Sequence, residues 1–454
     1  MSLSNNNKFT PEPLKLNIYV DYANELHNEY EQCIDEGLKI EQYKDLLFTV
    51  KNMPSGEFKE KFADIISEMI PNLPRKADFP YNEPSTLDEI RVLCNTSLWE
   101  SKKAVSDKEK KIAGAWYGRI AGCLLGKPIE GIRDELIPFL KDTGNYPMHR
   151  YITDADLTDD IVNKYEYGFK GKCYPDTIEC APVDDDTNYP VLYQNLIEKY
   201  GRDFTANDVA SFWLVAQPVT AYYTAERAAY INTMLGYLPP HSAIVRNPYR
   251  EWIGAQIRGD YFGYINMGNP EKAAEMASRD ASVSHIKNGI YGEMWASAMI
   301  ACAAVCDTAK EAVLGGLSQI PQTSRLYKEV FGIIEKHENG KTFDELYAFV
   351  HKKYDHHNSH HWCHTISNAL IVTTALLCGE DDFSKSICLA AQCGFDTDCN
   401  AATVGSVIGM MKGIDAIDEC WTKPLNGRLR TQVFGSECVE IQDLINKTTE
   451  HCNQ

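Results

Sequence analysis

The sequence has no apolar segment long enough to span a membrane. No uninterrupted apolar run approaches the roughly 20 residues that such a span needs. The first ten residues are polar and contain no apolar core of a signal peptide. We therefore expect a cytoplasmic protein without a membrane partner.

Paired cysteines and excess basic charge are also missing. The 15 cysteines form no CxxC pair and lie in apolar stretches such as that of Cys302 and Cys306, which is typical of buried thiols rather than a secreted disulfide framework. The formal net charge is −19. Because such a charge repels a phosphate backbone and attracts cations, we expect no nucleic-acid partner.

Three motifs of other enzyme classes do not occur. The sequence contains no dinucleotide-binding fingerprint, no Walker P-loop and no HExxH. Their absence argues against redox and NTPase functions. The composition, with 44% apolar and 24% charged residues, is that of an ordinary folded protein.

Helical periodicity dominates the chain, and the only candidates for strands are weak ones near 147–152. We therefore predict an all-α fold. Helical segments such as 18–38 are followed by four prolines within residues 71–84. This pattern predicts an N-terminal helical extension and Pro-rich linker in residues 1–100, followed by the main domain in residues 101–454.

Two segments carry glycine at every fourth position, which places the glycines along one ridge of a helix. Each helical glycine costs about 1 kcal/mol relative to alanine, so the two rows forgo roughly 7 kcal/mol unless close packing compensates. We predict that these helices cross each other or neighbouring helices at short distance, bringing their end residues together. The alternative is that some glycines are caps or kinks. The rows are Gly114, Gly118, Gly122 and Gly126, and Gly405, Gly409 and Gly413.

Two acidic clusters each stand just before a helical segment. The first is Asp184, Asp185 and Asp186, and adjacent carboxylates of this kind need a cation or the positive end of a helix. Taken alone, this triplet also fits a solvated helix cap. The second is Asp396 and Asp398, whose i, i+2 spacing suits a ligand pair only on a turn. Together they predict a site for hard divalent cations, with two ions roughly 3.5 to 4 Å apart.

Five histidines between residues 356 and 364 raise the alternative of a zinc hydrolase. Two pairs have the i, i+4 spacing that zinc ligands use on a helix. Because HExxH is absent, we expect polar residues at a helix start beside the cleft instead. The five are His356, His357, His360, His361 and His364.

The order of these motifs resembles the ADP-ribosylglycohydrolase family. A glycine-ridged helix ends in GxPxE at Glu130, a DDT follows at 185–187, and a DTD at 396–398 precedes Asn400 and a small-residue helix. The resemblance spans about residues 106–415. It implies an orthogonal all-α bundle, a site for Mg²⁺ (two ions, with Mn²⁺ possible), and hydrolysis of an N- or O-glycosidic ADP-ribosyl bond in small-molecule or protein-linked substrates.

The resemblance also implies roles for particular residues. Glu130 matches a catalytic or substrate-orienting glutamate, although an exposed helix-end carboxylate is the alternative. Asp186 and Asp398 are further candidates for the catalytic base. The predicted metal ligands are Asp184, Asp185, Asp186, Asp396 and Asp398.

Three positions depart from the family pattern. Asp184 stands where relatives usually have Thr or Ser, Cys399 where they usually have Thr, and Cys123 where many have Asp. A thiol is a poor ligand for a hard cation, so one ion is expected to be weaker, differently coordinated or absent, while Asp184 adds an oxygen. These departures leave open a catalytically inactive ADP-ribose-binding protein.

The substrate contacts are predicted on two further segments. Ser284, His285 and Asn288 belong to a segment that resembles the cleft lining of longer relatives, with a buried polar network as the alternative. Gly394, just before the second acidic pair, is also predicted to bind substrate. A long insertion at 132–183 can act as a lid and rebuild the pocket, which keeps open a hydrolase of another ribosyl glycoside or nucleoside. The sequence leaves the oligomeric state undetermined.

Overall fold

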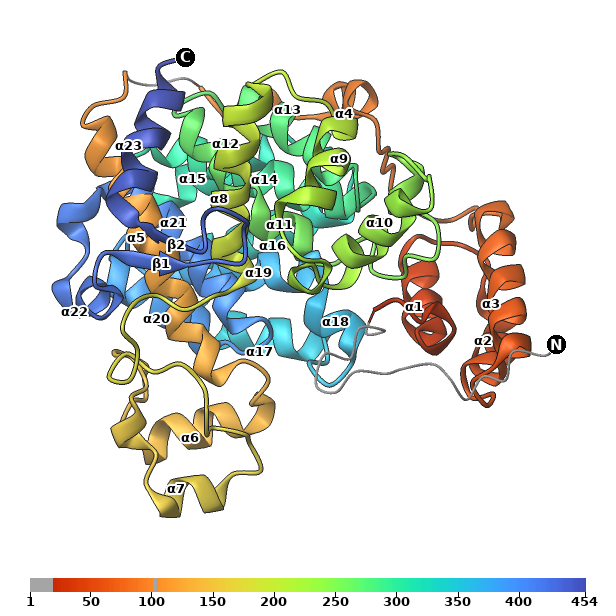
Figure 1. Ribbon diagram of the computed structural model, residues 1–454, viewed down its shortest axis with the longest axis horizontal. Coiled ribbons are helices and arrows are strands. Elements are labelled where there is room, and N and C mark those ends of the chain that lie inside the picture. Colours follow the sequence, from red (N-terminus) through yellow and green to blue (C-terminus); the bar gives the residue numbers. More distant parts are fainter. Residues whose placement is uncertain (1–18, 101–103) are drawn as a thin grey trace.

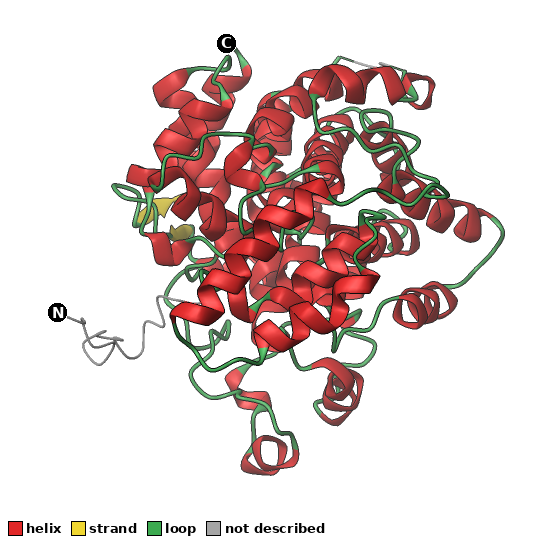
Figure 2. Ribbon diagram, turned by 90° about the vertical axis from the view of Figure 1, so that its right-hand side faces the viewer, coloured by secondary structure: helices red, strands yellow, loops and turns green. Residues whose placement is uncertain are grey.

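The computed structural model describes residues 19–100 and 104–454, and these residues are mostly helical (Figures 1 and 2). Their two strands, β1 (Arg428–Arg430) and β2 (Cys438–Glu440), form one small antiparallel ribbon. The predicted all-α fold is confirmed. The helices are α1 (Leu26–Asp35), α2 (Lys44–Lys51), α3 (Glu57–Met69), α4 (Leu87–Leu93), α5 (Lys108–Gly126), α6 (Leu136–Asp142), α7 (Asp159–Lys164), α8 (Asp185–Tyr200), α9 (Ala206–Ala216), α10 (Thr224–Met234), α11 (Gly254–Arg258), α12 (Asp260–Ile265), α13 (Pro270–Ala281), α14 (Lys287–Ala303), α15 (Ala309–Leu317), α16 (Arg325–Glu338), α17 (Phe343–Lys353), α18 (Ser359–Cys363), α19 (Thr365–Cys378), α20 (Phe383–Gln392), α21 (Thr397–Lys412), α22 (Glu419–Thr422) and α23 (Ile441–Cys452).

The weak strand candidates near 147–152 were wrong. This stretch has no regular secondary structure. The buried side chain of Asn145 bonds to the backbone of this stretch. Its side-chain NH₂ donates to the Arg150 carbonyl (2.9 Å), and its side-chain oxygen accepts from the His149 N–H (3.0 Å). A side chain that satisfies backbone groups in this way removes the need for a partner strand.

Helices α5 and α21 lie antiparallel in direct backbone contact, as the glycine spacing predicts. Gly114 faces Gly409, and Gly118 faces Gly405. A methyl group added at Gly118 would overlap the carbonyl oxygen of Gly405. At the end of the row, Gly126 meets the start of α21, so the crossing brings the end of α5 next to the second acidic pair.

The main core surrounds this crossing. Helix α14 is buried along its entire length, and α8 packs close to α5. The N-cap of α8 is Asp184, so the first acidic cluster also opens beside the α5–α21 pair. Two distant chain segments thereby place their helix N-termini at one location.

Helices α1, α2 and α3 share an apolar cluster of their own, formed by residues such as Leu26, Leu47 and Ile66. They lie at the right-hand edge of Figure 1. The proline-rich stretch then leads back to the main body, where Ile90 of α4 belongs to the large central cluster. The predicted domain division at residue 100 stays a prediction, and α4 packs with the main domain.

The 132–183 insertion contains two short helices, α6 and α7, that project at the lower end of Figure 1. Its core includes stacked rings of Phe139 and Phe169, with centroids 4.7 Å apart. Across the described part of the chain, no helix combines the length and apolarity needed to cross a membrane.

Candidate active site

One cavity collects carboxylates from four separate segments. Glu130 follows α5, the first aspartate cluster opens α8, and the second opens α21. Most of these carboxylates are buried. The acids that line the cavity are Glu130, Asp184, Asp185, Asp396 and Asp398, together with Glu226 of α10, which pairs with Arg258 (2.6 Å).

Aromatic side chains form another part of the same cavity wall. These residues come from the N-terminal segment, from α8, and from the regions of α10, α11 and α18. Sequence reasoning missed them because isolated aromatic residues carry no positional motif. They are Tyr19, Tyr189, Tyr223, Trp252 and Trp362.

In the first acidic cluster, Asp184 both caps a helix and lines the cavity. Asp184 caps α8, since its Oδ1 accepts from the Asp186 N–H (2.9 Å). The other oxygen of Asp184 pairs with the Lys127 ammonium. Both the helix-cap interpretation and the site interpretation of this triplet therefore describe part of the structure.

Asp186 is held by a buried arginine. The guanidinium of Arg119 contacts Asp186 Oδ1 (2.7 Å) and Asp260 Oδ2 (2.8 Å), and all three residues are fully buried. The second oxygen of Asp186, Oδ2, is buried without a hydrogen-bond partner. A buried oxygen without a partner is costly, so this atom fits the ligand of a cation.

The second acidic pair stands at the N-terminus of α21. Its backbone is fixed by the Thr397 hydroxyl, which donates to the Gly126 carbonyl (2.9 Å), and by Asn368 Oδ1, which accepts from the Asp396 N–H (3.3 Å). Asp398 Oδ1 accepts from the Cys399 N–H (3.1 Å). The pair therefore lies on the turn and first residues of the helix, where both carboxylates reach the cavity.

Ligand atoms from these segments come within 4.8 Å of one another in three overlapping groups. Asp398 belongs to two of them and Asp186 to two, which links the clusters. These acidic groups are able to hold metal ions. The groups are Glu130–Asp396–Asp398, Asp186–Asp398–Cys399 and Cys123–Asp184–Asp186.

The electrostatics also favour a cation. Burial, followed by repulsion from neighbouring carboxylates, raises the pKa of Asp185 and Asp396 well above the usual range. The charge of Asp398, followed by burial, raises the pKa of Glu130 in the same way. Since the carboxylates disfavour one another's ionised form, a divalent cation among them would stabilise their charges.

Cys123 and Cys399 are buried beside these carboxylates. Burial is the main cause that raises the pKa of both thiols well above the ordinary value, and neighbouring aspartates add to it. The thiols therefore stay protonated at neutral pH and are poor ligands for a hard cation. All three departures from the family pattern, Cys123, Asp184 and Cys399, therefore belong to these ligand groups.

The residues predicted to bind substrate in the 279–289 segment do not line the cavity. Ser284, His285 and Asn288 are buried. The Ser284 hydroxyl contacts His285 Nδ1 (2.8 Å), and the Asn288 amide donates to Glu251 (3.1 Å). Their position gives the substrate-contact prediction no support, because they belong to a buried polar network, in which His285 Nε2 has no hydrogen-bond partner among the described residues.

Gly394 also lies outside the acidic cavity. It lines a neighbouring cavity together with Asp134, His356 and His357. The two histidines contact the Asp134 carboxylate through Nε2, each at 2.8 Å. The predicted direct contact of Gly394 with substrate therefore has no support from its position.

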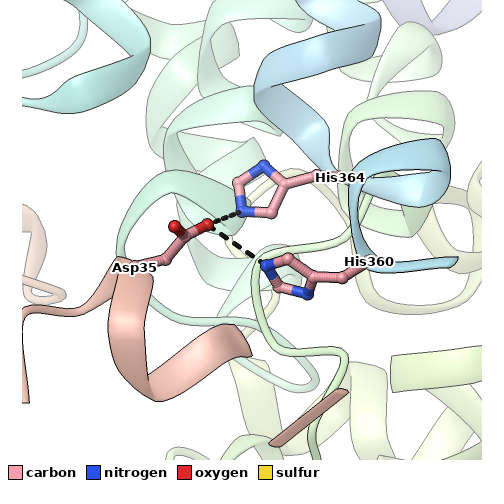
Figure 3. Close-up of side chains that lie close together, drawn as sticks. All are labelled: Asp35, His360 and His364. Carbon is pink, nitrogen blue, oxygen red and sulfur yellow. Dashed lines mark hydrogen bonds and ion pairs between the residues drawn. The ribbon is translucent and has the colours of Figure 1, made fainter. Parts of the chain in front are cut away.

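His360 and His364 both contact Asp35, at 3.1 and 3.5 Å (Figure 3). Their Nδ1 atoms accept hydrogen bonds from the Trp252 indole and the Ile366 N–H, both at 3.0 Å. Each neutral imidazole must then carry its proton on Nε2, which faces Asp35. A metal would need a lone pair at Nε2, so the pattern favours a hydrogen-bonded contact over zinc between these three residues.

The fold and the site define an all-helical protein whose buried carboxylates can hold metal ions. The sequence model of the ADP-ribosylglycohydrolase family matches residues 104–453, and the chain belongs to this family of glycohydrolases. A solved structure titled "ADP-ribosylglycohydrolase-related protein complex" is 16% identical, with 76% of this chain and 98% of that chain covered and a TM-score of 0.48. None of the curated proteins compared matches the chain.

Proposed function

We propose that this protein is a magnesium-dependent hydrolase that cleaves an N- or O-glycosidic ADP-ribosyl bond. The observation that carries the proposal is the meeting of Asp186 and Asp398, from the starts of two distant helices, within one group of ligand atoms. Family membership supplies the substrate class. The substrate is ADP-ribose linked to a small molecule or a protein.

The cations would be held by both acidic clusters. Hard carboxylate oxygens favour Mg²⁺ or Mn²⁺, and the three overlapping groups support two ions. When bound, such ions orient ribose hydroxyls and lower the pKa of a water molecule. The unpartnered Oδ2 of Asp186 is the clearest single position for a ligand atom.

Water attack at the anomeric carbon passes through an oxocarbenium-like transition state and requires a group that accepts a proton. Glu130 and Asp398 line the cavity, whereas Asp186 does not and is engaged by Arg119. The geometry therefore favours Glu130 or Asp398 as the base, with Asp186 as a ligand. The Tyr167 hydroxyl donates to the Glu130 carbonyl (2.6 Å), so the insertion helps to position Glu130.

The aromatic wall suits the remainder of the substrate. Flat aromatic side chains bind a nucleotide base by stacking, and they exclude water from the reacting centre. Tyr189 and Trp362 lie on this wall. In the sequence, Tyr189 follows the first acidic cluster and Trp362 lies within the histidine cluster. The arrangement supports a substrate with a ribose at the acids and a planar base at the rings.

A second candidate is a catalytically inactive ADP-ribose-binding protein. The observation that favours it is the pair of buried thiols, Cys123 and Cys399, inside two of the three ligand groups. This candidate predicts tight ADP-ribose binding without product release in Mg²⁺. The third candidate is a hydrolase of another ribosyl glycoside or nucleoside. Hydrolysis of a nucleoside, without hydrolysis of any ADP-ribosyl substrate, would identify it.

The proposal is tested by product release. The full chain is incubated with arginine-, serine- and acyl-linked ADP-ribosyl peptides, with Mg²⁺ or with a chelator, and free ADP-ribose is separated by chromatography. We expect release from at least one linkage, lost with the chelator and in Asp398→Asn. Binding of ADP-ribose without release from any linkage would support the binding protein instead.

A further inference from the structure

We propose that the N-terminal segment, which carries Tyr19 and α1, forms part of the substrate-binding site. Tyr19 supplies part of the aromatic wall, and Asp35 positions Trp252 through His360. Both Tyr19 and Asp35 precede residues 104–453, which the family model matches. The inference rests on the proposed function, because it assigns these residues to the binding of the same substrate.

Tyr19 is packed into the cavity wall on several sides. Its ring meets Tyr249 edge-on, with centroids 5.8 Å apart, and Tyr223, with centroids 6.3 Å apart. The Arg227 guanidinium lies 5.6 Å from the Tyr19 centroid and 5.8 Å from that of Tyr223. These contacts fix the ring in the cavity wall.

A buried ionic contact holds the segment against the main domain. Arg250 pairs with Glu29 (2.8 Å) and Glu36 (2.7 Å) of the N-terminal segment, and Lys287 also pairs with Glu36. All four side chains are largely buried. Since buried charges that lose their partner are strongly destabilising, these ion pairs hold the segment against the main domain.

Asp35, the last residue of α1, reaches the cavity wall through one histidine. Its carboxylate accepts from Nε2 of His360 (3.1 Å), as Figure 3 shows. Nδ1 of His360 accepts from the indole N–H of Trp252 (3.0 Å), and Trp252 lines the cavity. The carboxylate selects the imidazole tautomer that accepts from Trp252, so Asp35 is a positioning residue for that indole.

The consequence is a site whose two halves come from different parts of the chain. The family-matched domain supplies the acidic half, where the ribose and cations are placed. The aromatic half depends on the N-terminal segment, directly at Tyr19 and indirectly at Trp252. The ligand that this half fits is the planar base of a nucleotide.

The first test replaces the Tyr19 ring. Tyr19→Ala is compared with Tyr19→Phe, which keeps the ring, and with Phe58→Ala, a control at an exposed aromatic residue of α3. Calorimetry measures ADP-ribose binding, and steady-state kinetics separates KM from kcat. We expect Tyr19→Ala to raise both Kd and KM by at least about fivefold, with kcat within about twofold, because stacking of one base on one ring contributes about this much.

The second test follows Trp252 itself. Protein labelled with 5-fluorotryptophan gives a fluorine resonance for each of its 7 tryptophans, and Trp252→Phe identifies the relevant one. We expect Asp35→Ala to shift or broaden the Trp252 resonance and to raise KM. Asp35→Asn keeps an acceptor oxygen for His360 and should restore most of both.

The outcomes separate the two proposals. An active wild type with unchanged KM in Tyr19→Ala, or an unmoved Trp252 resonance in folded Asp35→Ala, overturns the inference and leaves the proposed function standing. A wild type that neither binds ADP-ribose nor releases it overturns the proposed function and this inference with it. Far-ultraviolet circular dichroism establishes that each variant is folded.

Discussion

Gly126 lies against the backbone of Asp398, at the point where α5 ends and α21 begins. A methyl group at position 126 would overlap the Thr397–Asp398 peptide itself. The acidic cavity therefore depends on the close contact of these two helices, because this contact fixes Asp398 beside the residues that follow α5.

Substitution within the glycine rows should destabilise the fold. In Gly118→Ala the new methyl group would meet the Gly405 carbonyl oxygen, and backbone cannot rotate away as a side chain can. We expect a loss of about 1–3 kcal/mol in the free energy of unfolding, measured with urea. Gly168→Ala is the control, since nothing lies within 4 Å of its added Cβ. Equal stability of both variants would contradict the close crossing.

Removing one carboxylate should separate metal binding from stability. Asp398→Asn relieves like-charge repulsion with Glu130 and Asp396, so the metal-free protein should be as stable as the wild type or more so. Its thermal stabilisation by Mg²⁺ should disappear. Differential scanning fluorimetry with and without Mg²⁺ measures both effects, and an unchanged Mg²⁺ response would refute Asp398 as a ligand.

Replacement of the buried Arg119 should strongly destabilise the protein. Arg119→Met leaves Asp186 and Asp260 without their shared partner. We expect a loss of about 3–5 kcal/mol in the free energy of unfolding. Adding Asp260→Asn to the variant should recover part of this loss, because it removes one of the uncompensated charges. A mild effect of the single variant would mean that the pair is poorly formed in solution.

Restoring an oxygen at position 399 should strengthen the cation site. Cys399→Thr exchanges a buried thiol for a hydroxyl in a group that contains Asp186 and Asp398. We expect the Kd for Mg²⁺, measured by calorimetry, to fall several-fold, since a hard cation prefers oxygen to a protonated sulfur. Cys302→Ser, in buried α14 outside the cavity lining, should leave it unchanged. A weaker Mg²⁺ affinity in Cys399→Thr would argue against this position as a ligand.

Acidification should reduce the contribution of buried His285 to stability, whereas the buried carboxylates with a raised pKa act in the opposite direction. Burial lowers the pKa of His285 well below its usual range, so the unfolded chain binds a proton that the folded chain does not. The contribution of neutral His285 to stability is then fully present above about pH 6.5 and falls below it, by up to about 1.4 kcal/mol per pH unit. In urea unfolding between about pH 7.5 and 5.5, the free energy of unfolding of His285→Gln should rise relative to that of the wild type as the pH falls. Parallel curves would exclude His285 as a source of the dependence.

The sequence alone determined the features that depend on local spacing. Glycine at every fourth residue predicted the close helix crossing, because a helical ridge repeats at that interval. The aspartates at 184–186 and 396–398 were identifiable as helix-start clusters because each group directly precedes a helical segment. Helical periodicity likewise predicted the all-α fold.

Tertiary structure decided which of these local features meet. Ser284 and His285 have the composition of a binding segment, yet packing encloses them in a buried network. Tyr19 and Asp35 carry no motif, and only the docking of the N-terminal segment brings them to Tyr249 and His360. The physical reason is that periodicity shows which face of a helix is buried, while long-range packing selects the segment that covers it.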